Sequence, residues 1–452
     1  MTVASRTRRL ALAALLLASL PWAAAPAAHA EDPFLRRTPT VRAVEKVGPS
    51  VVNVTTRRAG RRGPFRPFGD PFFDRFFEDF FEMRAPESIQ NLGSGVVIDA
   101  AGHVLTNEHV VSRAEEIRVT LADGRELEAR LIGAEPNFDL AVLELVDPER
   151  VPWTAPGSSE DLLVGEPVIA IGNPFGLSNS VTTGVVSALN RSVRTKDRVY
   201  HGFLQTDASI NPGNSGGPLL NAEGTLIGIN TAVYQGAQGI GFAIPIDVAK
   251  RVVRELLSKG EVSPVWLGLE VQDLDGEIAE LMALPRHLNG VLVRGVREEG
   301  PAARSGIARG EVVLRIEGAP LRSAREYYEH LERATSGQRL ELTLWRDGAE
   351  RRQGITAEAI PEDQIQALGE RLLGLELEPE AKGGFRVAGV RAGSGAARIG
   401  IEPGDRVLGI NGRGLASGSD RRRALLDLRG RSHALVVVQR GRGRYHVTVP
   451  LS

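Results

Sequence analysis

A serine flanked by glycines has the surroundings that nucleophilic chemistry requires. Ser215 lies in the segment Asn211-Pro212-Gly213-Asn214-Ser215-Gly216-Gly217-Pro218. Glycines allow a tight turn that presents a hydroxyl and leaves room for a second chain. The backbone N–H groups of Gly213, Asn214 and Ser215 are candidate donors to an oxygen that becomes negatively charged. The same segment could be an ordinary glycine-rich turn. A catalytic role for Ser215 requires a second residue that can act as a base and accept its proton.

Histidine is the side chain that could act as this base. After residue 30 the chain contains seven: His103, His109, His201, His287, His330, His433 and His446. His109 lies between apolar residues in Leu105-Thr106-Asn107-Glu108-His109-Val110-Val111, where its ring can be held firmly. A lone histidine in such a place is more often structural, so the assignment depends on a carboxylate that could orient the ring.

Asp139 is the candidate carboxylate. It begins the apolar run Asp139-Leu140-Ala141-Val142-Leu143. An aspartate at the start of a buried strand requires a partner, because burying an unpaired carboxylate is costly. Alone, such an aspartate is more often a capping or turn residue than a catalytic one.

Together, three blocks in the order His, Asp, Ser resemble the HtrA/Deg family (Do-type) of serine proteases. They are Thr106-Asn107-Glu108-His109-Val110, Asp139-Leu140-Ala141-Val142 and Gly213-Asn214-Ser215-Gly216-Gly217. This order is that of chymotrypsin-like barrels. The resemblance implies a mainly β protein, with a chymotrypsin-like double β-barrel followed by two PDZ domains, which are partly opened β-barrels with helices. It also implies that Ser215 is the nucleophile, His109 the base and Asp139 the group that orients it.

The resemblance further implies a substrate cleft. The strand Thr231-Ala232-Val233 is expected to pair with the substrate backbone. The primary pocket is expected to involve Val233, Ile240, Ser209 and Ile210. None of these is charged, so cleavage after small or medium aliphatic residues is expected rather than after Lys or Arg.

An internal repeat follows residue 260. Residues 301–318 and 395–412 share ten of eighteen positions at an offset of 94, which predicts two copies of one small domain. The predicted boundaries are 261–358 and 366–452, with a linker at 359–366. The first copy has Gly310-Glu311 where the second has Gly404-Asp405.

Each copy opens with an apolar-Gly-apolar element like the carboxylate-binding loop of PDZ domains. These are Leu267-Gly268-Leu269 and Leu373-Gly374-Leu375. The first is predicted to bind C-terminal peptides, which add as a strand to a sheet edge. The second has the weaker case, and a structural or inter-subunit role is open for both.

Residues 31–260 are the predicted protease domain. Short apolar runs broken by Gly, Asn and Asp indicate a barrel or sandwich, and a helix lined by Val248, Val252 and Leu256 closes the unit. An insertion at about 57–91 holds eight of the fourteen Phe residues. Its aromatic stripe could cover the domain's own core. The resemblance implies a regulatory loop at this place, whose stripe would contact a neighbouring subunit or gate the active site.

The N-terminus and the composition bound the location and the partners. Residues 1–30 contain three Arg, then an apolar run, then Ala28-His29-Ala30. This pattern is typical of a cleaved signal peptide. The alternative is an uncleaved anchor. The chain contains no Cys, which with an export signal favours the bacterial periplasm, and its net charge of −1 argues against nucleic acid as a partner.

The predicted function is an ATP-independent endopeptidase that degrades misfolded or damaged exported proteins. No cofactor or metal is expected, since a phosphate-binding loop and the His-Glu-x-x-His motif are both missing from the sequence. The resemblance implies a homo-oligomer built from trimers. The alternative is a non-hydrolytic periplasmic chaperone or peptide-binding scaffold.

Overall fold

The structure covers most of the chain after the predicted signal peptide. A computed structural model describes residues 36–57, 90–112, 114–174, 179–194, 199–211, 213–233, 239–285 and 288–451. The signal peptide predicted at 1–30 and nearly all of the Phe-rich insertion predicted at 57–91 lie outside the described residues. Within those ranges no helix is long and apolar enough to cross a membrane.

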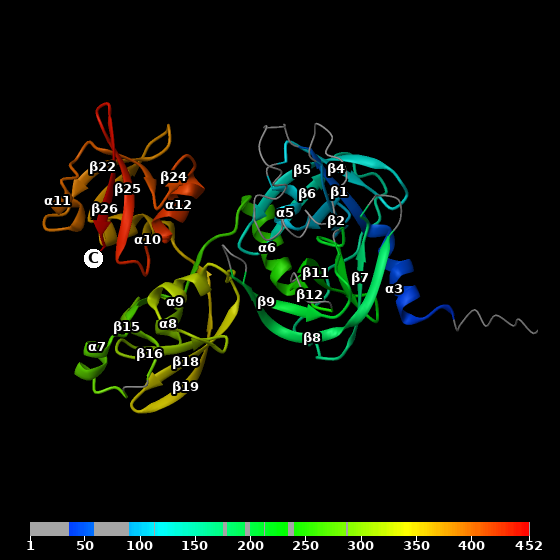
Figure 1. Ribbon diagram of the computed structural model, residues 1–452, viewed down its shortest axis with the longest axis horizontal. Helices are drawn as coiled ribbons and strands as arrows, with labels where there is room; N and C mark the ends of the chain where they lie inside the picture. Colours follow the sequence, from blue (N-terminus) through cyan, green and yellow to red (C-terminus); the bar gives the residue numbers. More distant parts are fainter. Residues whose placement is uncertain are drawn as a thin grey trace, which may run out of the picture.

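Within the described residues, the N-terminal part of the chain contains a closed six-stranded barrel (Figure 1). Helix α3 (Pro39–Val47) and the 3₁₀ turn η1 (Gly48–Ser50) lead into it. The barrel order is β1-β2-β3-β6-β5-β4, with β1 (Val51–Arg57), β2 (Gln90–Val97), β3 (His103–Thr106), β4 (Glu116–Thr120), β5 (Glu126–Glu135) and β6 (Leu140–Leu145). Strand β4 alternates exposed Glu116 and Arg118 with buried Ile117 and Val119, the period of two expected of a strand with one buried face.

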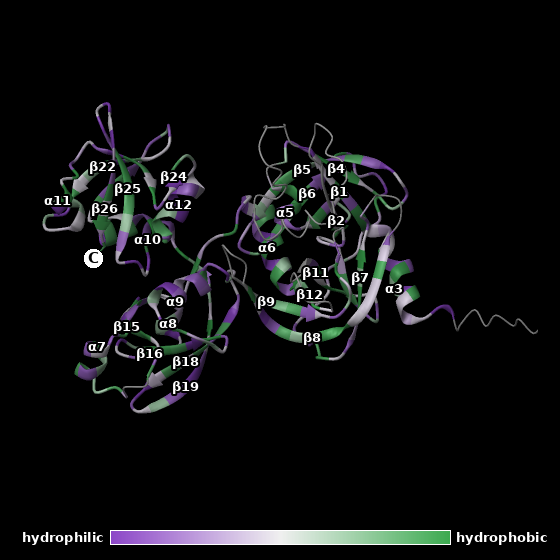
Figure 2. Ribbon diagram, in the orientation of Figure 1, coloured by the Kyte–Doolittle hydropathy of each residue, from purple (hydrophilic) through white to green (hydrophobic). Residues whose placement is uncertain are grey.

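A second closed barrel follows in the described part of the chain. Its order is β10-β11-β12-β9-β8-β7, with β7 (Pro167–Gly172), β8 (Ser180–Arg194), β9 (Val199–Thr206), β10 (Pro218–Asn221), β11 (Leu226–Val233) and β12 (Gly241–Pro245). The predicted double β-barrel is therefore confirmed. Hydrophobic stretches follow its strands and those of the two C-terminal units (Figure 2).

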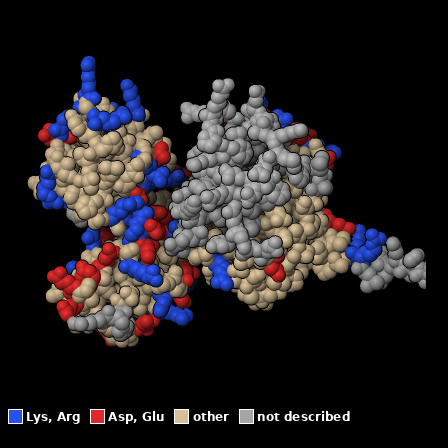
Figure 3. Space-filling view, viewed as in Figure 1, with Lys and Arg blue, Asp and Glu red and all other residues tan. Residues whose placement is uncertain are grey.

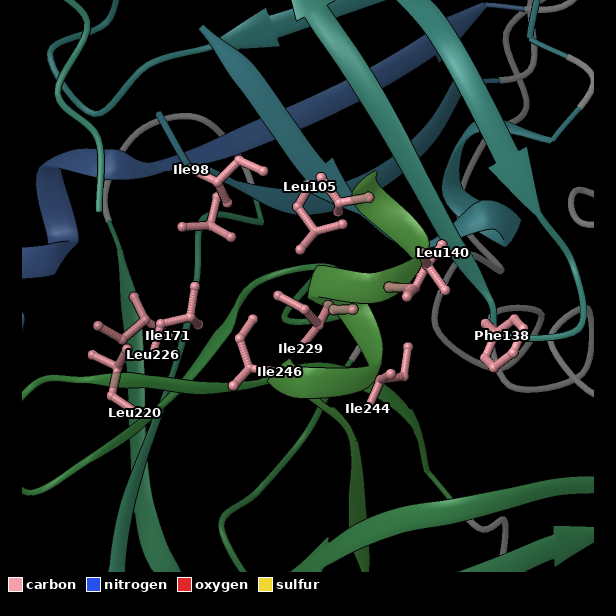
Figure 4. Close-up of a cluster of buried hydrophobic side chains, with 14 of the residues drawn as sticks. Ile98, Leu105, Phe138, Leu140, Ile171, Leu220, Leu226, Ile229, Ile244 and Ile246 are labelled. Atoms are coloured by element: carbon pink, nitrogen blue, oxygen red, sulfur yellow. The ribbon is translucent and has the colours of Figure 1, made fainter. Parts of the chain in front are cut away.

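One buried hydrophobic cluster extends through both barrels, and each barrel has a further cluster of its own. Ile98, Leu105 and Leu140 of the first barrel belong to the same buried cluster as Ile171 and Ile229 of the second (Figure 4). Fully burying a side chain of this size contributes roughly 1.5–3 kcal/mol. The shared core therefore holds the barrels as one body and fixes the seam between them.

Helix α6 (Ile246–Lys259) closes this body and packs on strands of both barrels, β5 and β6 of the first and β11 and β12 of the second. The predicted helix face is confirmed for Val252 and Leu256, which are fully buried, while Val248 is half-buried. Gly260 ends the helix at φ +74°, and its N–H donates to the carbonyl of Leu256. A left-handed glycine is a common way to end a helix.

The C-terminal repeat produces two units with the same strand order. The first has the order β14-β15-β16-β18-β19, with β14 (Leu269–Asp273), β15 (Val291–Val296), β16 (Val312–Ile316), β17 (Ala319–Pro320) paired to β16, β18 (Arg339–Arg346) and β19 (Ala349–Thr356). Its helices are α7 (Gly276–Leu281), α8 (Pro301–Arg304) and α9 (Ala324–Leu331), and β13 (Val265–Trp266) pairs with β20 (Glu358–Ala359).

The second unit repeats this order as β21-β22-β23-β25-β26. Its strands are β21 (Leu375–Pro379), β22 (Phe385–Val390), β23 (Arg406–Ile410), β24 (Arg413–Gly414) paired to β23, β25 (His433–Arg440) and β26 (Gly443–Pro450). Its helices are α10 (Glu362–Leu368), the π-helical turn η2 (Gly369–Leu373), α11 (Gly395–Ile399) and α12 (Gly418–Leu426). The segment predicted as a linker at 359–366 thus contains the first residues of α10.

Candidate active site

His109 and Asp139 meet at the seam of the barrels. His109 lies on the one-turn helix α5 (Glu108–Val111), directly after β3. Its Nδ1 lies 2.9 Å from both carboxylate oxygens of Asp139, and its backbone N–H donates to Oδ1 at 3.1 Å. The two side chains are 3% and 2% exposed. A buried carboxylate on Nδ1 keeps that nitrogen protonated and leaves Nε2 as the basic nitrogen.

Asp139 is held from three sides. It precedes β6 at φ +53°, in the left-handed region, which aspartate tolerates better than most residues. Its backbone carbonyl accepts from Nδ2 of Asn107 at 2.9 Å, and its Oδ2 accepts from Oγ1 of Thr231 at 2.6 Å. Thr231 belongs to β11 of the second barrel, so this bond crosses the seam. The sequence placed Thr231 only in the substrate strand and gave no sign that its hydroxyl reaches Asp139.

Ser215 lies in the turn before β10, and two neighbouring glycines are required there. Gly213 has φ +102° and Gly216 has φ +86°, a region that side chains rarely adopt. A Cβ on Gly216 would also lie 2.1 Å from the backbone oxygen of Ser94. The glycine pattern that drew attention to Ser215 is therefore demanded by backbone geometry and by close contact with β2.

In the turn that carries Ser215, one of the three candidate N–H groups is already bonded. The N–H of Asn214 donates to the carbonyl of Asn211 at 3.0 Å. Among the described residues, no acceptor is bonded to the N–H of Gly213 or of Ser215. Of the three donors predicted for an oxyanion, these two are the ones that the turn does not already use.

A second bond crosses the seam at Ser215 itself. The backbone N–H of Ser94, in β2 of the first barrel, donates to the carbonyl of Ser215 at 2.8 Å. Together with the Thr231–Asp139 bond, it brings the three predicted residues, which come from distant parts of the chain, to one interface.

The predicted pocket residues are only partly described. Ile210 is buried, Ile240 is half-buried against the barrel core, and the carbonyl of Ser209 accepts from Nδ2 of Asn214 at 3.3 Å. Ala232 and Val233 end strand β11, and their side chains lie outside the described part of the structure.

The predicted peptide loop of the first repeat follows β13. Gly268 has φ +76°, and a Cβ there would lie 2.9 Å from Cα of Gly300. The carbonyls of Leu267 and Gly268 accept from the N–H groups of Ala302 and Arg297 at 2.8 and 2.9 Å, while Leu269 begins β14. The loop is thus fixed at the end of the groove between β14 and α9.

That groove is covered by the second repeat. One pocket is lined by β14 and α9 residues together with residues of α10, η2 and a loop of the second repeat: Trp266, Gly268, Leu269, Glu270, Arg297, Tyr328, Leu331, Ile360, Gln364, Leu368, Arg371 and Arg429. The guanidinium of Arg429 lies 4.7 Å from the ring centre of Tyr328, and Arg371 pairs with Glu270 at 3.1 Å. Charged side chains of both signs cover the two repeats (Figure 3).

Both repeats also contact the turn that carries Asp139. Arg423 of α12 pairs with the buried Glu135 at 3.1 Å. Nδ2 of Asn137 donates to the carbonyl of Glu332, just after α9, at 3.5 Å. These contacts fall within four residues of Asp139, whose carboxylate contacts His109.

Two tandem barrels that bring His, Asp and Ser to their seam define a trypsin-like serine peptidase. Family models agree: a trypsin-like peptidase domain matches residues 93–229, and PDZ domains match residues 265–356 and 364–431. The chain belongs to the family of DegP-like periplasmic serine endoproteases.

Two curated relatives carry the name "Probable periplasmic serine endoprotease DegP-like". The one from Halomonas elongata is 39% identical over 399 residues, covering 81% of this chain and 83% of the relative. The one from Pseudomonas putida (strain W619) is 37% identical over 441 residues, covering 89% and 91%. Among solved structures, the HtrA-type protease AlgW with a decapeptide is 39% identical, covers 71% of this chain and 98% of that one, and gives a TM-score of 0.47.

The family membership decides between the functions predicted from the sequence. The protein is a serine endopeptidase, and the non-hydrolytic chaperone alternative is not favoured. The predicted periplasmic location agrees with the names of the relatives.

Proposed function

We propose that Ser215 is the nucleophile, His109 the general base and Asp139 its orienting group. Oγ of Ser215 attacks the peptide carbonyl while its proton passes to Nε2 of His109. The C–N bond then breaks, the proton moves to the leaving amine, and an ester on Ser215 remains. Water, deprotonated by His109, hydrolyses that ester and restores the hydroxyl.

The negative charge that develops on the carbonyl oxygen is stabilised by the N–H groups of Gly213 and Ser215, and Asn214 supports the turn through its own bond to Asn211. Donors fixed in advance are effective because they need no reorganisation during the reaction. The observation that carries the proposal is the buried contact of His109 with Asp139, reinforced by the hydroxyl of Thr231.

The decisive experiment replaces the nucleophile. Ser215→Ala is expected to lower kcat/KM for an unfolded model protein by ~10⁴-fold or more. Ser50→Ala is the matched control, because Ser50 is also buried and its hydroxyl donates to the carbonyl of Val47 at 2.7 Å, outside the proposed triad. Hydrolysis at the wild-type rate by purified Ser215→Ala protein contradicts the proposal.

The substrates proposed are misfolded or damaged exported proteins, cut after small or medium aliphatic residues. Thr231, Ala232 and Val233 are proposed to pair with the substrate backbone, and Val233 and Ile240 to form pocket walls. The described pocket residues Ser209, Ile210 and Ile240 carry no charge, which supports this preference. Mass spectrometry of the products from an unfolded protein tests it, and a majority of cuts after Lys or Arg refutes it.

The first PDZ domain is proposed to bind C-terminal peptides at Leu267, Gly268 and Leu269. The position of this loop at the end of the groove between β14 and α9 supports the assignment. Because α10 and Arg429 cover the groove, a peptide enters only when the second PDZ domain moves aside. The boundaries proposed are 31–260 for the protease domain, 261–358 for the first PDZ domain and 366–452 for the second.

Two remaining proposals concern assembly and export. The protein is proposed to form homo-oligomers built from trimers, and sedimentation of the full chain tests this, a monomer being the contrary result. Residues 1–30 are proposed to be a cleaved signal peptide. The intact mass of exported protein tests this proposal, because cleavage leaves Glu31 as the first residue.

A further inference from the structure

Ser94 is a buried serine outside the proposed triad whose two donors both point at the nucleophile turn. It lies in β2 of the first barrel and is 0% exposed. Its backbone N–H donates to the carbonyl of Ser215 at 2.8 Å, and its hydroxyl donates to the carbonyl of Gly213. One residue of the opposite barrel therefore binds the carbonyls on both sides of Asn214.

The hydroxyl of Ser94 is itself fixed. It accepts the N–H of Asn173 at 2.7 Å, so its single proton remains for Gly213. The carbonyl of Asn173 in turn accepts from Nδ2 of Asn53 at 2.9 Å, and the carbonyl of Ser94 accepts from Oγ1 of Thr106 at 2.7 Å. The hydroxyls of Ser94 and Thr106 and the carbonyls of Asn173 and Ser94 are thus paired, and buried hydrogen bonds linked in this way hold these groups in place.

The Gly213 carbonyl belongs to the same peptide plane as the N–H of Asn214, which donates to Asn211. The orientation of that plane depends on ψ of Gly213 and φ of Asn214. The plane joins the two peptide planes that carry the N–H groups of Gly213 and Ser215, so displacing it changes how those two N–H groups are aimed relative to each other. Gly213 has no Cβ to restrict ψ, so its own conformation offers little resistance. The bond from Ser94 holds the carbonyl side of the plane, and the bond to Asn211 holds its N–H side.

We propose that Ser94 is a positioning residue that fixes the Gly213–Asn214 peptide and thereby aims the N–H groups of Gly213 and Ser215 at the oxyanion. This inference rests on the proposed roles of Ser215, Gly213 and His109. Ser94 does not touch the substrate. It acts through the turn, and its effect belongs to the step in which charge develops on the carbonyl oxygen.

The test is Ser94→Ala in the full chain, compared with wild type and with Ser50→Ala. Removing an oxyanion donor outright costs about 10²–10³ in kcat, so loosening the donors is expected to lower kcat by about 10- to 100-fold. KM is expected to stay within about 2-fold of wild type, since ground-state binding does not use these donors. Active sites are counted with a fluorophosphonate, so that kcat refers to folded, reactive molecules only.

Two further readouts separate positioning from simple destabilisation. Affinity for a peptide boronate, which forms a tetrahedral adduct with the serine, is expected to fall in proportion to kcat. The pH profile of kcat/KM is expected to keep its midpoint, because the pair of His109 and Asp139 is untouched. Ser94→Thr, which keeps a hydroxyl, is expected to retain more activity than Ser94→Ala when both variants melt at the same temperature.

Each contrary outcome has a distinct meaning. If kcat per titrated site in Ser94→Ala equals that of Ser50→Ala while Ser215→Ala is inactive, the positioning role is wrong and the proposed mechanism stands. A shifted pH midpoint also overturns the inference, since Ser94 would then act through His109. If Ser215→Ala remains active, the proposed mechanism itself fails.

Discussion

Helix α10 lies between the two PDZ domains and serves each of them differently. Toward the second domain, Ile365 and Leu368 are buried in its hydrophobic core, and α10 and η2 pack against α12 and β21. Toward the first domain, Gln364 and Leu368 of α10 line the pocket over the groove between β14 and α9, and Arg371 of η2 pairs there with Glu270. The same helix is thus an integral part of one domain and a cover on the other.

The two domains also bury an acid at equivalent positions with different partners. Glu311 is 3% exposed and accepts from Arg351 at 2.8 Å and from Arg346 at 3.2 Å. Asp405 is 2% exposed and accepts from Arg440 at 2.7 and 2.6 Å. The longer glutamate, which departs from the usual Gly-Asp pattern, reaches two arginines where the aspartate reaches one.

These differences show that two copies of one sequence pattern diverge mainly through what packs around them. The repeated residues build the same strands and the same apolar-Gly-apolar loop in both domains. Among the described residues, the groove of the first domain is covered by residues of the second, which include Gln364, Leu368 and Arg429.

The largest expected effect is on the stability of the second PDZ domain, when the partner of its buried acid is removed. Arg440→Ala leaves Asp405 buried without a cation, and we expect the unfolding midpoint of the second PDZ domain to fall by on the order of 10 °C. Hydrogen exchange along β25 and β26 during a temperature series measures this. An unchanged midpoint, or an equal loss of protection in β18 and β19 of the first domain, contradicts the interpretation.

The matched change in the first domain is expected to cost less. Arg351→Ala leaves Arg346 beside Glu311, so we expect the midpoint of the first PDZ domain to fall by only about 3–5 °C. The same exchange experiment, read from β18 and β19, provides the measurement. A fall as large as that of Arg440→Ala would show that the second arginine gives no compensation.

Acid should reduce the difference between wild type and Arg440→Ala. The hydrogen bond from Arg440 lowers the pKa of Asp405, which means that the folded state binds the proton more weakly than the unfolded chain. The stability that Asp405 contributes is therefore present above about pH 4, the ordinary aspartate value, and is lost as the pH falls through the lower folded pKa. Melting both proteins from pH 6 to pH 3 checks this, and a constant difference contradicts it.

A smaller effect is expected at the cover of the first groove. Arg429→Ala removes the stacking on Tyr328 and favours the open arrangement, so the apparent affinity of the full chain for a peptide should rise about 3- to 10-fold. Fluorescence anisotropy of a labelled decapeptide with an aliphatic C-terminal residue measures it. Arg386→Ala is the control, since Arg386 pairs with Glu378 within the second domain. Equal peptide affinities of the two variants would contradict the view that Arg429 helps to keep the groove covered.

Much of this architecture was predictable because its determinants are local or periodic. The glycines around Ser215 and the apolar run after Asp139 each report a local backbone requirement. The repeat predicted two equal domains, and the structure gives them equal strand orders. The roles of His109, Asp139 and Ser215 stay a prediction, supported by the contacts described.

What the sequence did not reveal depends on contacts between distant segments. Ser94 lies 119 residues from Gly213, and Thr231 lies 92 residues from Asp139; neither has a local pattern that marks its partner. The sequence predicts a linker at 359–366, where α10 begins, because this helix is only seven residues long, too short for hydrophobic periodicity to indicate its buried face.

Two contacts link the protease domain to the PDZ domains: Arg423 with Glu135, and Asn137 with Glu332. They join the two PDZ domains to the turn that ends in Asp139. Coupling between two binding equilibria is reciprocal. Suppose that a ligand in the groove near Tyr328 changes the affinity of the barrels for a substrate at Ser215. The substrate then changes the affinity of the groove for its ligand by the same factor. Binding measured at either site therefore reports on the coupling to the other site.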